Sequence, residues 1–256
     1  MKFFKKMVSL AMASAMLMGF GVGINADSSL KISSIFPDKA LMNIVKKEFD
    51  SNSDGYLNST EISKAKAIHL DGVADMEGLQ YLTSCKTIYI SSSKMGSVNL
   101  SNYRNVETCY VLEADSVKTF IGGPGLKTLY INGSGITSIS LQRSRDLVDF
   151  TLIYNKTYSG ELNLSRNSKL KHIRFESDTK LEGIQFPKNA EVEQIMCDNL
   201  PNVHNIDIST SVKLSSLQCV YFTGMNVRSY RLPGDVFNLM CFRKEYAQNG
   251  QYIYLG

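Results

Sequence analysis

The residues best suited to bind a ligand lie in one short segment near the beginning of the chain. Residues 50–61 carry oxygen-bearing side chains at alternating positions, with Gly55 where the chain must turn sharply. Hard oxygen donors at this spacing are typical of a calcium loop, in which Tyr56 offers its carbonyl, Asn58 acts through a water and Glu61 offers two oxygens. The predicted calcium ligands are Asp50, Asn52, Asp54, Tyr56, Asn58 and Glu61.

The segments on either side of this loop predict two helices. Apolar residues from Leu41 to Phe49 have helical spacing with Asp38 as N-cap, and Ile62, Ala65 and Ile68 predict an exit helix. The whole resembles an EF-hand, a unit that commonly occurs in pairs, whereas this sequence has one copy. We therefore predict a structural calcium ion in a helical cap over residues 27–72. The alternative is an Asn/Asp-rich surface turn that binds no ion.

The remaining reactive side chains form no catalytic pattern in the sequence. HExxH, GxSxG, P-loop and Rossmann motifs are all missing from it. Cys197 and His204 suggest a nucleophile and base, but the repeat described next turns Cys197 into the core. We predict that the protein is not an enzyme.

A repeat organises most of the chain. The pattern apolar-x-x-apolar-x-apolar begins at residues 85, 106, 126, 147, 170, 192, 214 and 236, and successive steps measure 20 to 23 residues. A second apolar pair follows in most units, such as Val98 and Leu100. One such unit has too little core to fold alone, whereas stacked units share one. The fold class is therefore an α/β or mainly β solenoid, a right-handed coil with a parallel sheet on its concave face. The repeats cover residues 73–243, as a first repeat plus about eight coils.

Residues 73–90, which include the run Gly78-Leu79-Gln80-Tyr81-Leu82, resemble the first repeat of an internalin. Asn99-Leu100-Ser101-Asn102 and residues 163–167 resemble the return segment of short bacterial leucine-rich repeats. The family usually has Asn three residues beyond each strand, and its scarcity here predicts less regular turns. The residues at that position are Ser93, Ala114, Ser134, Asn155, Asp178, Leu200, Phe222 and Lys244. The resemblance implies a secreted protein whose partner is another protein, on a host or neighbouring cell.

The repeat register also places three of the five cysteines. Cys197, Cys219 and Cys241 share one strand position in successive coils. Some internalins have such a ladder of free thiols, and we interpret these side chains as small buried hydrophobes. A metal site is the alternative, but the spacing lacks a CxxC pair.

Residues that alternate with the core positions should face outward on the concave side. Three consecutive tyrosines occupy one outward row, and large apolar residues occur beside it. Such side chains are typical of protein interfaces, although strand-forming residues also pair on sheets that bind nothing. The predicted binding residues are Tyr89, Tyr110, Tyr130, Leu112, Ile153, Arg174, Met196 and Phe242.

The two ends of the chain have their own patterns. Residues 1–26 combine a basic start, an apolar run and a small residue at the end, which predicts a signal peptide and secretion. Asn249-Gly250 lies between strand-like flanks and predicts a capping hairpin over residues 244–256.

Composition excludes two further classes of function. The chain has 256 residues, 28 of them basic and 24 acidic; without the three lysines of residues 1–26 the charges nearly balance, so we expect no nucleic-acid partner. No later apolar run reaches the ~18 residues of a membrane span. We predict a secreted, non-catalytic binding protein, taken as a monomer, that binds an extracellular protein. The alternative partner is a carbohydrate or the cell wall, with sugar rings stacked on the tyrosines.

Overall fold

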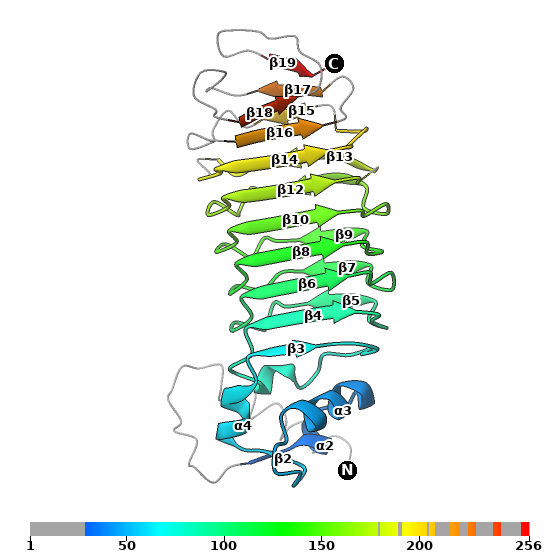
Figure 1. Cartoon of the computed structure of the whole chain (residues 1–256), viewed down its shortest axis with the longest axis vertical. Helices are drawn as coiled ribbons and strands as arrows, with labels where there is room; N and C mark the ends of the chain where they lie inside the picture. The colour runs from blue at the N-terminus through cyan, green and yellow to red at the C-terminus, as the bar shows by residue number, and fades with distance from the viewer. Residues whose placement is uncertain are drawn as a thin grey trace.

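The computed structural model is an elongated β-solenoid with a small helical cap at its N-terminal end (Figure 1). It describes residues 29–178, 180–188, 191–203 and 205–207, and beyond these the backbone of four strands between 216 and 255. The predicted signal peptide, Phe242 and His204 lie outside the described residues.

One parallel sheet of nine strands runs along the solenoid. Each strand pairs in register with the equivalent strand of the next coil, as Tyr89 does with Tyr110 and Tyr110 with Tyr130. The strands are β3 (Ala67–His69), β4 (Thr87–Ser91), β6 (Thr108–Leu112), β8 (Thr128–Asn132), β10 (Asp149–Ile153), β12 (His172–Glu176), β14 (Gln194–Asp198), β16 (Ser216–Val220) and β18 (Asn238–Cys241). The predicted parallel sheet is confirmed.

The first residue of the second apolar pair, such as Val98, lies on a return strand behind this sheet, and the second residue, such as Leu100, follows directly after that strand (Figure 1). The return strands form a sheet of three and a sheet of five. They are β5 (Ser97–Asn99), β7 (Thr119–Ile121), β9 (Ser138–Ser140), β11 (Gly160–Asn163), β13 (Leu181–Gln185), β15 (Asn205–Asp207), β17 (Met225–Arg228) and β19 (Tyr252–Leu255). The last strand pairs antiparallel with β17, while the first arm of the predicted hairpin lies outside the described residues.

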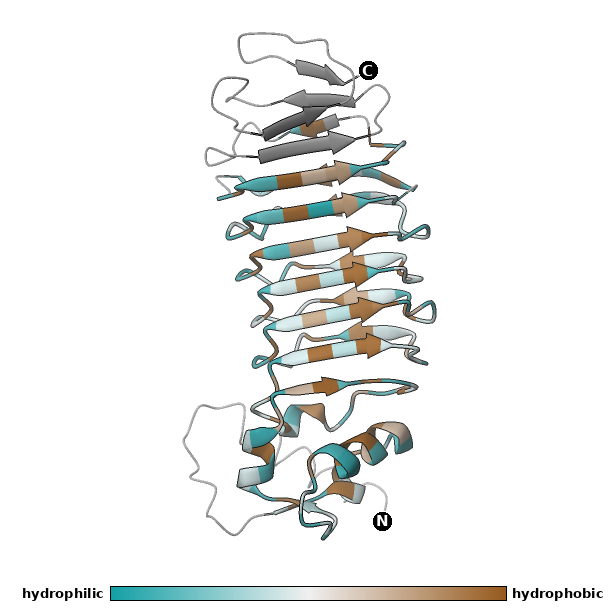
Figure 2. Cartoon of the chain, in the orientation of Figure 1, coloured by the Kyte–Doolittle hydropathy of each residue, from teal (hydrophilic) through white to brown (hydrophobic). Residues whose placement is uncertain are grey.

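The core is a column of apolar side chains between the two sets of strands, visible as brown positions that repeat from strand to strand (Figure 2). The three pattern positions of the first six repeats are all buried, from Cys85, Ile88 and Ile90 to Val192, Ile195 and Cys197. Burial of each such side chain contributes roughly 1.5–3 kcal/mol. Stacking thus supplies the core that a single coil lacks.

The turn that follows each of the first seven strands of this sheet, β3 to β14, contains the same unusual backbone conformation. Its first residue has a left-handed φ, between 43° and 67°, although only two of these residues are glycines. They are Gly72, Ser92, Glu113, Gly133, Tyr154, Ser177 and Asn199. The N–H of Glu113 donates to the carbonyl of Asn132 at 2.8 Å, so the ladder between coils continues into the turn.

The next residue in each turn occupies the position that the family gives to Asn, and it is buried from Ser93 to Leu200. The φ values repeat despite the scarcity of Asn, but the side chains at this position act differently from turn to turn. Some satisfy the backbone, whereas Ala114 and Leu200 have no polar side chain and Ser134 Oγ has no hydrogen-bond partner among the described residues. The Ser93 hydroxyl accepts the N–H of Met95 at 2.9 Å and donates to the carbonyl of Val73 at 3.1 Å. Asn155 Oδ1 accepts the N–H groups of Thr157 and Tyr158, both at 3.1 Å.

The N-terminal cap contains three short helices. Its elements are β1 (Leu30–Lys31), α2 (Ile32–Ile35), α3 (Lys39–Glu48), β2 (Tyr56–Leu57) and α4 (Ser59–Lys64), and the 3-10 helix η1 (Leu79–Tyr81) follows in the first repeat. Asp38 caps α3 through the N–H of Leu41 at 2.9 Å, and its other oxygen accepts the N–H groups of Ala74 and Asp75. One side chain thus joins the cap to the first repeat.

The predicted exit helix is shorter in the structure. Helix α4 ends at Lys64, and Ala67–His69 form β3, which pairs parallel with β4. Ala65-x-x-Ile68-x-Leu70 is in fact another copy of the repeat pattern, and all three residues are fully buried. The sheet therefore begins inside the segment assigned to the cap. None of the described helices is long and apolar enough to cross a membrane.

Candidate functional site

The outward residues of the nine-stranded sheet form straight rows, because every described strand pairs in the same register. The central row collects residues from seven consecutive strands, which we call the ring row after its aromatic members. It consists of His69, Tyr89, Tyr110, Tyr130, Thr151, Arg174 and Met196. Strand pairing therefore brings five of the eight predicted binding residues into one line.

The aromatic rings of the first strands stack on one another. The ring centroids of His69 and Tyr89 are 4.4 Å apart with planes at 6°, and those of Tyr89 and Tyr110 are 4.8 Å apart at 4°. Tyr110 and Tyr130 are 5.9 Å apart and tilted by 48°. Parallel rings at about the spacing of the strands turn their faces toward each other. The rings therefore offer mainly edges and hydroxyl groups to a partner.

His69 is the member of the ring row that the sequence prediction missed. The predicted exit helix includes the neighbouring Ile68, whereas His69 lies on β3 beside Tyr89. The signal was available, since Ala65 begins a repeat match that stands 20 residues before Cys85. This match is hard to recognise in the sequence because its first apolar residue is the small Ala65.

Ion pairs border the ring row on one side. Glu107 accepts hydrogen bonds from Lys127, at 2.8 Å, and from Lys86. These two lysines lower the pKa of Glu107 to about 2. This edge of the face keeps its charge over the physiological pH range.

The other predicted binding residues differ in their exposure. Leu112 and Met196 are half-buried, and Arg174 is exposed and paired with Glu176. Ile153 is only 4% exposed, so its prediction as a contact residue needs correction: its side chain is already covered in the free chain.

The described cysteines are core residues. Cys85, Cys109 and Cys197 are free and buried, and Cys197 aligns with Cys219 and then Cys241 in the strand register. Burial raises the pKa of Cys85 to about 11, although a hydrogen bond to Thr87 opposes the shift, and it raises the pKa of Cys109 still further. Such thiols are poor nucleophiles because the thiolate is the reactive form.

The predicted calcium loop connects α3 to α4 in the cap. Gly55 has φ +80°, and its carbonyl accepts the N–H of Ile32 at 3.1 Å, so the preceding β1–α2 segment supports the loop. Asp50 accepts the N–H groups of Asp54 and Gly55 at 3.1 and 2.9 Å. Asp54 in turn accepts the N–H of Tyr56 at 2.8 Å. These bonds hold the loop in a tight turn, in which Asp50 is buried while Asn52 and Asp54 are exposed.

Glu61 closes the loop from the first turn of α4. It is 2% exposed, and it accepts the N–H groups of Ser51 at 2.8 Å and of Asn58 at 3.0 Å. Burial alone would raise its pKa, but these donors outweigh burial and hold the pKa below the usual value. Glu61 is therefore ionised, as a cation ligand must be.

The loop supplies donors of the right type for a hard cation. Each carboxylate oxygen has two lone pairs, so an oxygen that accepts one N–H retains capacity for a metal. Within the described ranges, however, no three His, Cys, Asp or Glu side chains gather into a group that would hold a metal ion. The calcium site therefore stays a prediction.

Comparison with known proteins finds similarity among solved structures alone. No protein-family model and no curated protein match the chain. Among solved structures, internalin C2 from Listeria monocytogenes str. 4b F2365 is 17% identical, with a TM-score of 0.48 over 77% of this chain and 98% of that one. The functional domain of InlJ from Listeria monocytogenes, described as including a cysteine ladder, is 14% identical, with a TM-score of 0.31 over 85% of this chain and 62% of that one.

A third similar structure is the internalin InlF from Listeria monocytogenes str. 4b F2365, which is 14% identical, with a TM-score of 0.29 over 88% of this chain and 99% of that one. At these values the likeness carries no argument about function. The solenoid itself is established by the parallel pairing of its strands.

Proposed function

We propose that the chain is a secreted, non-catalytic leucine-rich repeat protein that binds another protein on the outward face of its nine-stranded sheet. The observation that carries this proposal is the ring row, in which four aromatic side chains are in contact along consecutive strands and the first three are stacked. Half-exposed tyrosines are typical of interface hot spots because they combine apolar area with a hydroxyl group. The stacked rings are already ordered in the free chain. Binding of a partner therefore costs little side-chain entropy at these residues.

The geometry favours a protein over the carbohydrate alternative. A sugar ring stacks on the face of an aromatic ring, but both faces of Tyr89 point at neighbouring rings. Edges and hydroxyl groups suit the backbone and side chains of a protein better. A glycan array probed with the purified chain tests the alternative directly.

The tyrosines are expected to be essential for binding and dispensable for folding. In the double variant Tyr110→Thr/Tyr130→Thr, we expect protein capture by the immobilised chain to fall at least tenfold, with Tm within about 3 °C of wild type. Threonine is the natural residue of this row at position 151 and preserves strand propensity. The measurement is quantitative mass spectrometry of captured proteins.

Tyr81→Thr is the matched control, because Tyr81 is half-buried on η1, away from the sheet. It should leave capture unchanged. Equal capture by wild type and the double variant would exclude the ring row as the binding surface.

We also propose that the 50–61 loop binds a structural calcium ion through the six predicted ligands. The support is the ligand spacing together with the ionised, buried Glu61. Three carboxylates in an extracellular module suggest a dissociation constant of ~10⁻⁴–10⁻³ M. At 10 mM calcium this affinity corresponds to about 1.5–3 kcal/mol of stabilisation.

The test compares melting curves in 10 mM calcium and in EDTA. Wild type should gain about 3–8 °C in calcium, and Glu61→Gln should lose this gain. The calcium-dependent gain is the informative quantity, because Glu61 also caps α4 without the ion. Identical wild-type curves in calcium and EDTA would show that the loop is only a turn.

A further inference from the structure

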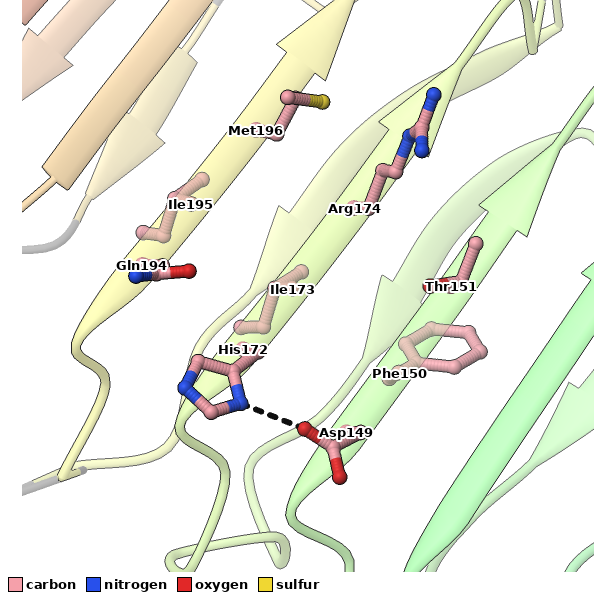
Figure 3. A pocket seen from close by; sticks show the side chains of 9 residues that line it. All are labelled: Asp149, Phe150, Thr151, His172, Ile173, Arg174, Gln194, Ile195 and Met196. Atoms are coloured by element: carbon pink, nitrogen blue, oxygen red, sulfur yellow. Dashed lines mark hydrogen bonds and ion pairs between the residues drawn. The ribbon is translucent and has the colours of Figure 1, made fainter. Parts of the chain in front are cut away.

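A hollow of about 290 Å³ opens on the outward face of the sheet, next to the aromatic part of the ring row (Figure 3). Its floor is the strand backbone at Phe150, Ile173 and Ile195, whose side chains are buried in the core on the other side of the sheet. Its walls come from strands β10, β12 and β14 and consist of Asp149, Thr151, His172, Arg174, Gln194 and Met196. The hollow has room for one long side chain.

The hollow exists because the large aromatic side chains of the ring row end before Thr151. The row contains tyrosines up to Tyr130, then the short Thr151, then Arg174. The Arg174 guanidinium bonds Glu176 on the same strand, and the His172 ring turns to Asp149, with Nδ1 2.6 Å from Oδ1 (Figure 3). Both long side chains thus point away from the space above Thr151.

The surroundings of the hollow carry an excess of negative charge. The cationic groups are already engaged, Arg174 with Glu176 and Lys171 with Glu193 at 3.0 Å. Residues 148–153, 171–176 and 193–198 contain four carboxylates and two cationic side chains, which gives a charge of −2 with His172 neutral. The corresponding segments of β3 to β8 contain Lys66, Lys86 and Lys127 against Asp71 and Glu107, which gives +1.

One of these carboxylates is under-satisfied. Asp198 Oδ1 is buried and has no hydrogen-bond partner among the described residues. Its pKa is raised, first by burial and then by the neighbouring charge of Glu176, although Arg174 opposes the shift. A further positive charge above β12 and β14 would stabilise the ionised form of Asp198 and offset the repulsion from Glu176. A further negative charge would destabilise the ionised form.

We propose that the hollow receives a lysine or arginine side chain of the partner protein, whose adjacent aromatic or apolar residues lie along the ring row. This inference rests on the proposed function, because it names the chemistry of the partner on the same face. Asp149 in the wall and Glu193 at its margin lie on either side of His172, 2.6 and 4.0 Å from its two ring nitrogens, and accept the basic group. Met196 contacts the aliphatic stem of that group.

The probe is a display library of random dodecapeptides selected against the full chain. Peptides that fail to bind the Tyr110→Thr/Tyr130→Thr variant define the ligands of this face. We expect these peptides to be enriched in Lys and Arg relative to the library. Their affinity should fall about tenfold for Asp149→Asn/Glu193→Gln, which removes two charges at nearly constant shape.

The matched control is Glu161→Gln/Glu182→Gln, which removes the same charge from exposed positions on the return strands β11 and β13. Its peptide affinities should stay within twofold of wild type. Peptides that depend on the tyrosines but carry no basic enrichment, and bind Asp149→Asn/Glu193→Gln normally, would overturn this inference and leave the proposed function standing. Failure to obtain any peptide that depends on the tyrosines would count against both.

Discussion

The Gly123→Ala variant is expected to lose about 3 kcal/mol or more of unfolding free energy, because Gly123 touches the backbone of the preceding coil. A Cβ atom at this position would lie 2.3 Å from the carbonyl oxygen of Leu100 and 3.1 Å from its carbonyl carbon. Backbone atoms cannot rotate away as a flexible side chain can, so the two coils would have to separate. Urea denaturation followed by circular dichroism measures the loss.

Gly96→Ala is the matched control, since its Cβ would meet nothing within 4 Å. The same substitution there should be neutral or slightly stabilising, by up to about 1 kcal/mol, because alanine restricts the unfolded chain. Equal stability of the two variants would mean that adjacent coils are not packed backbone to backbone.

The second large effect concerns Asp178, a fully buried carboxyl group in the turn after β12. Its pKa is raised from 3.8 to about 8, chiefly by burial; the hydrogen bond from the Asn155 N–H, 2.9 Å long, opposes this rise, and the charge of Glu176 contributes to it. Its Oδ2 atom has no partner within the described part of the chain. The folded protein therefore holds a proton at neutral pH that the unfolded chain releases.

The sign of the pH dependence follows from this difference in proton binding. Between pH ~4 and ~8 the folded state binds one proton more, so the unfolding free energy falls as pH rises, by up to about 1.4 kcal/mol per pH unit. Above pH ~8 both states are ionised and the fall ends. The Asp178 carboxyl group therefore destabilises the folded state least at low pH, where it is protonated in both states.

Asp178→Asn should remove this contribution, because asparagine stays neutral and is the residue at the equivalent position 155. We expect the variant to be more stable than wild type by at least about 2 kcal/mol at pH 8, with the difference shrinking toward pH 4. Asp115→Asn, on an exposed turn residue, should change stability by less than about 0.5 kcal/mol at either pH. A wild-type-like pH profile for Asp178→Asn would show that the buried carboxyl group is ionised in the fold.

The sequence was sufficient for the solenoid because its signal is periodic. The three apolar positions of each unit, such as Leu126, Leu129 and Ile131, recur at nearly constant steps and are buried as predicted. The same register placed the tyrosines of the ring row in adjacent strands. A period of about 20 residues determines which side chains lie one above another, whatever the detailed turn.

Two features required the structure. Strand β3 was hidden because the helical spacing of Ile62, Ala65 and Ile68 competes with the strand spacing of Ile68 and Leu70. The regularity of the turns was hidden because φ is a backbone property, and non-glycine residues such as Glu113 adopt the left-handed conformation here. The surrounding coils impose that conformation, at a local cost of about 1–2 kcal/mol per residue.

The binding face also combines predictable and unpredictable parts. Alternation along each strand predicted that Tyr110 and Arg174 lie outward, and both do so. Alternation does not predict that Ile153 is covered, nor that Arg174 and His172 turn aside to leave a hollow above Thr151. Those features depend on the rotamers of neighbouring side chains, which a repeat pattern does not encode.

The central claim is that successive coils stack in parallel with one register, which aligns the outward face. Spin labels at Thr87 and His172, and in a second sample at Thr108 and Gln194, test it by electron double resonance. Each pair spans four strand spacings in the sheet, so both should give the same mean distance of ~19 Å plus the length of the labels. Distances that differ between the two pairs by more than about 5 Å, the equivalent of one strand spacing, would contradict it.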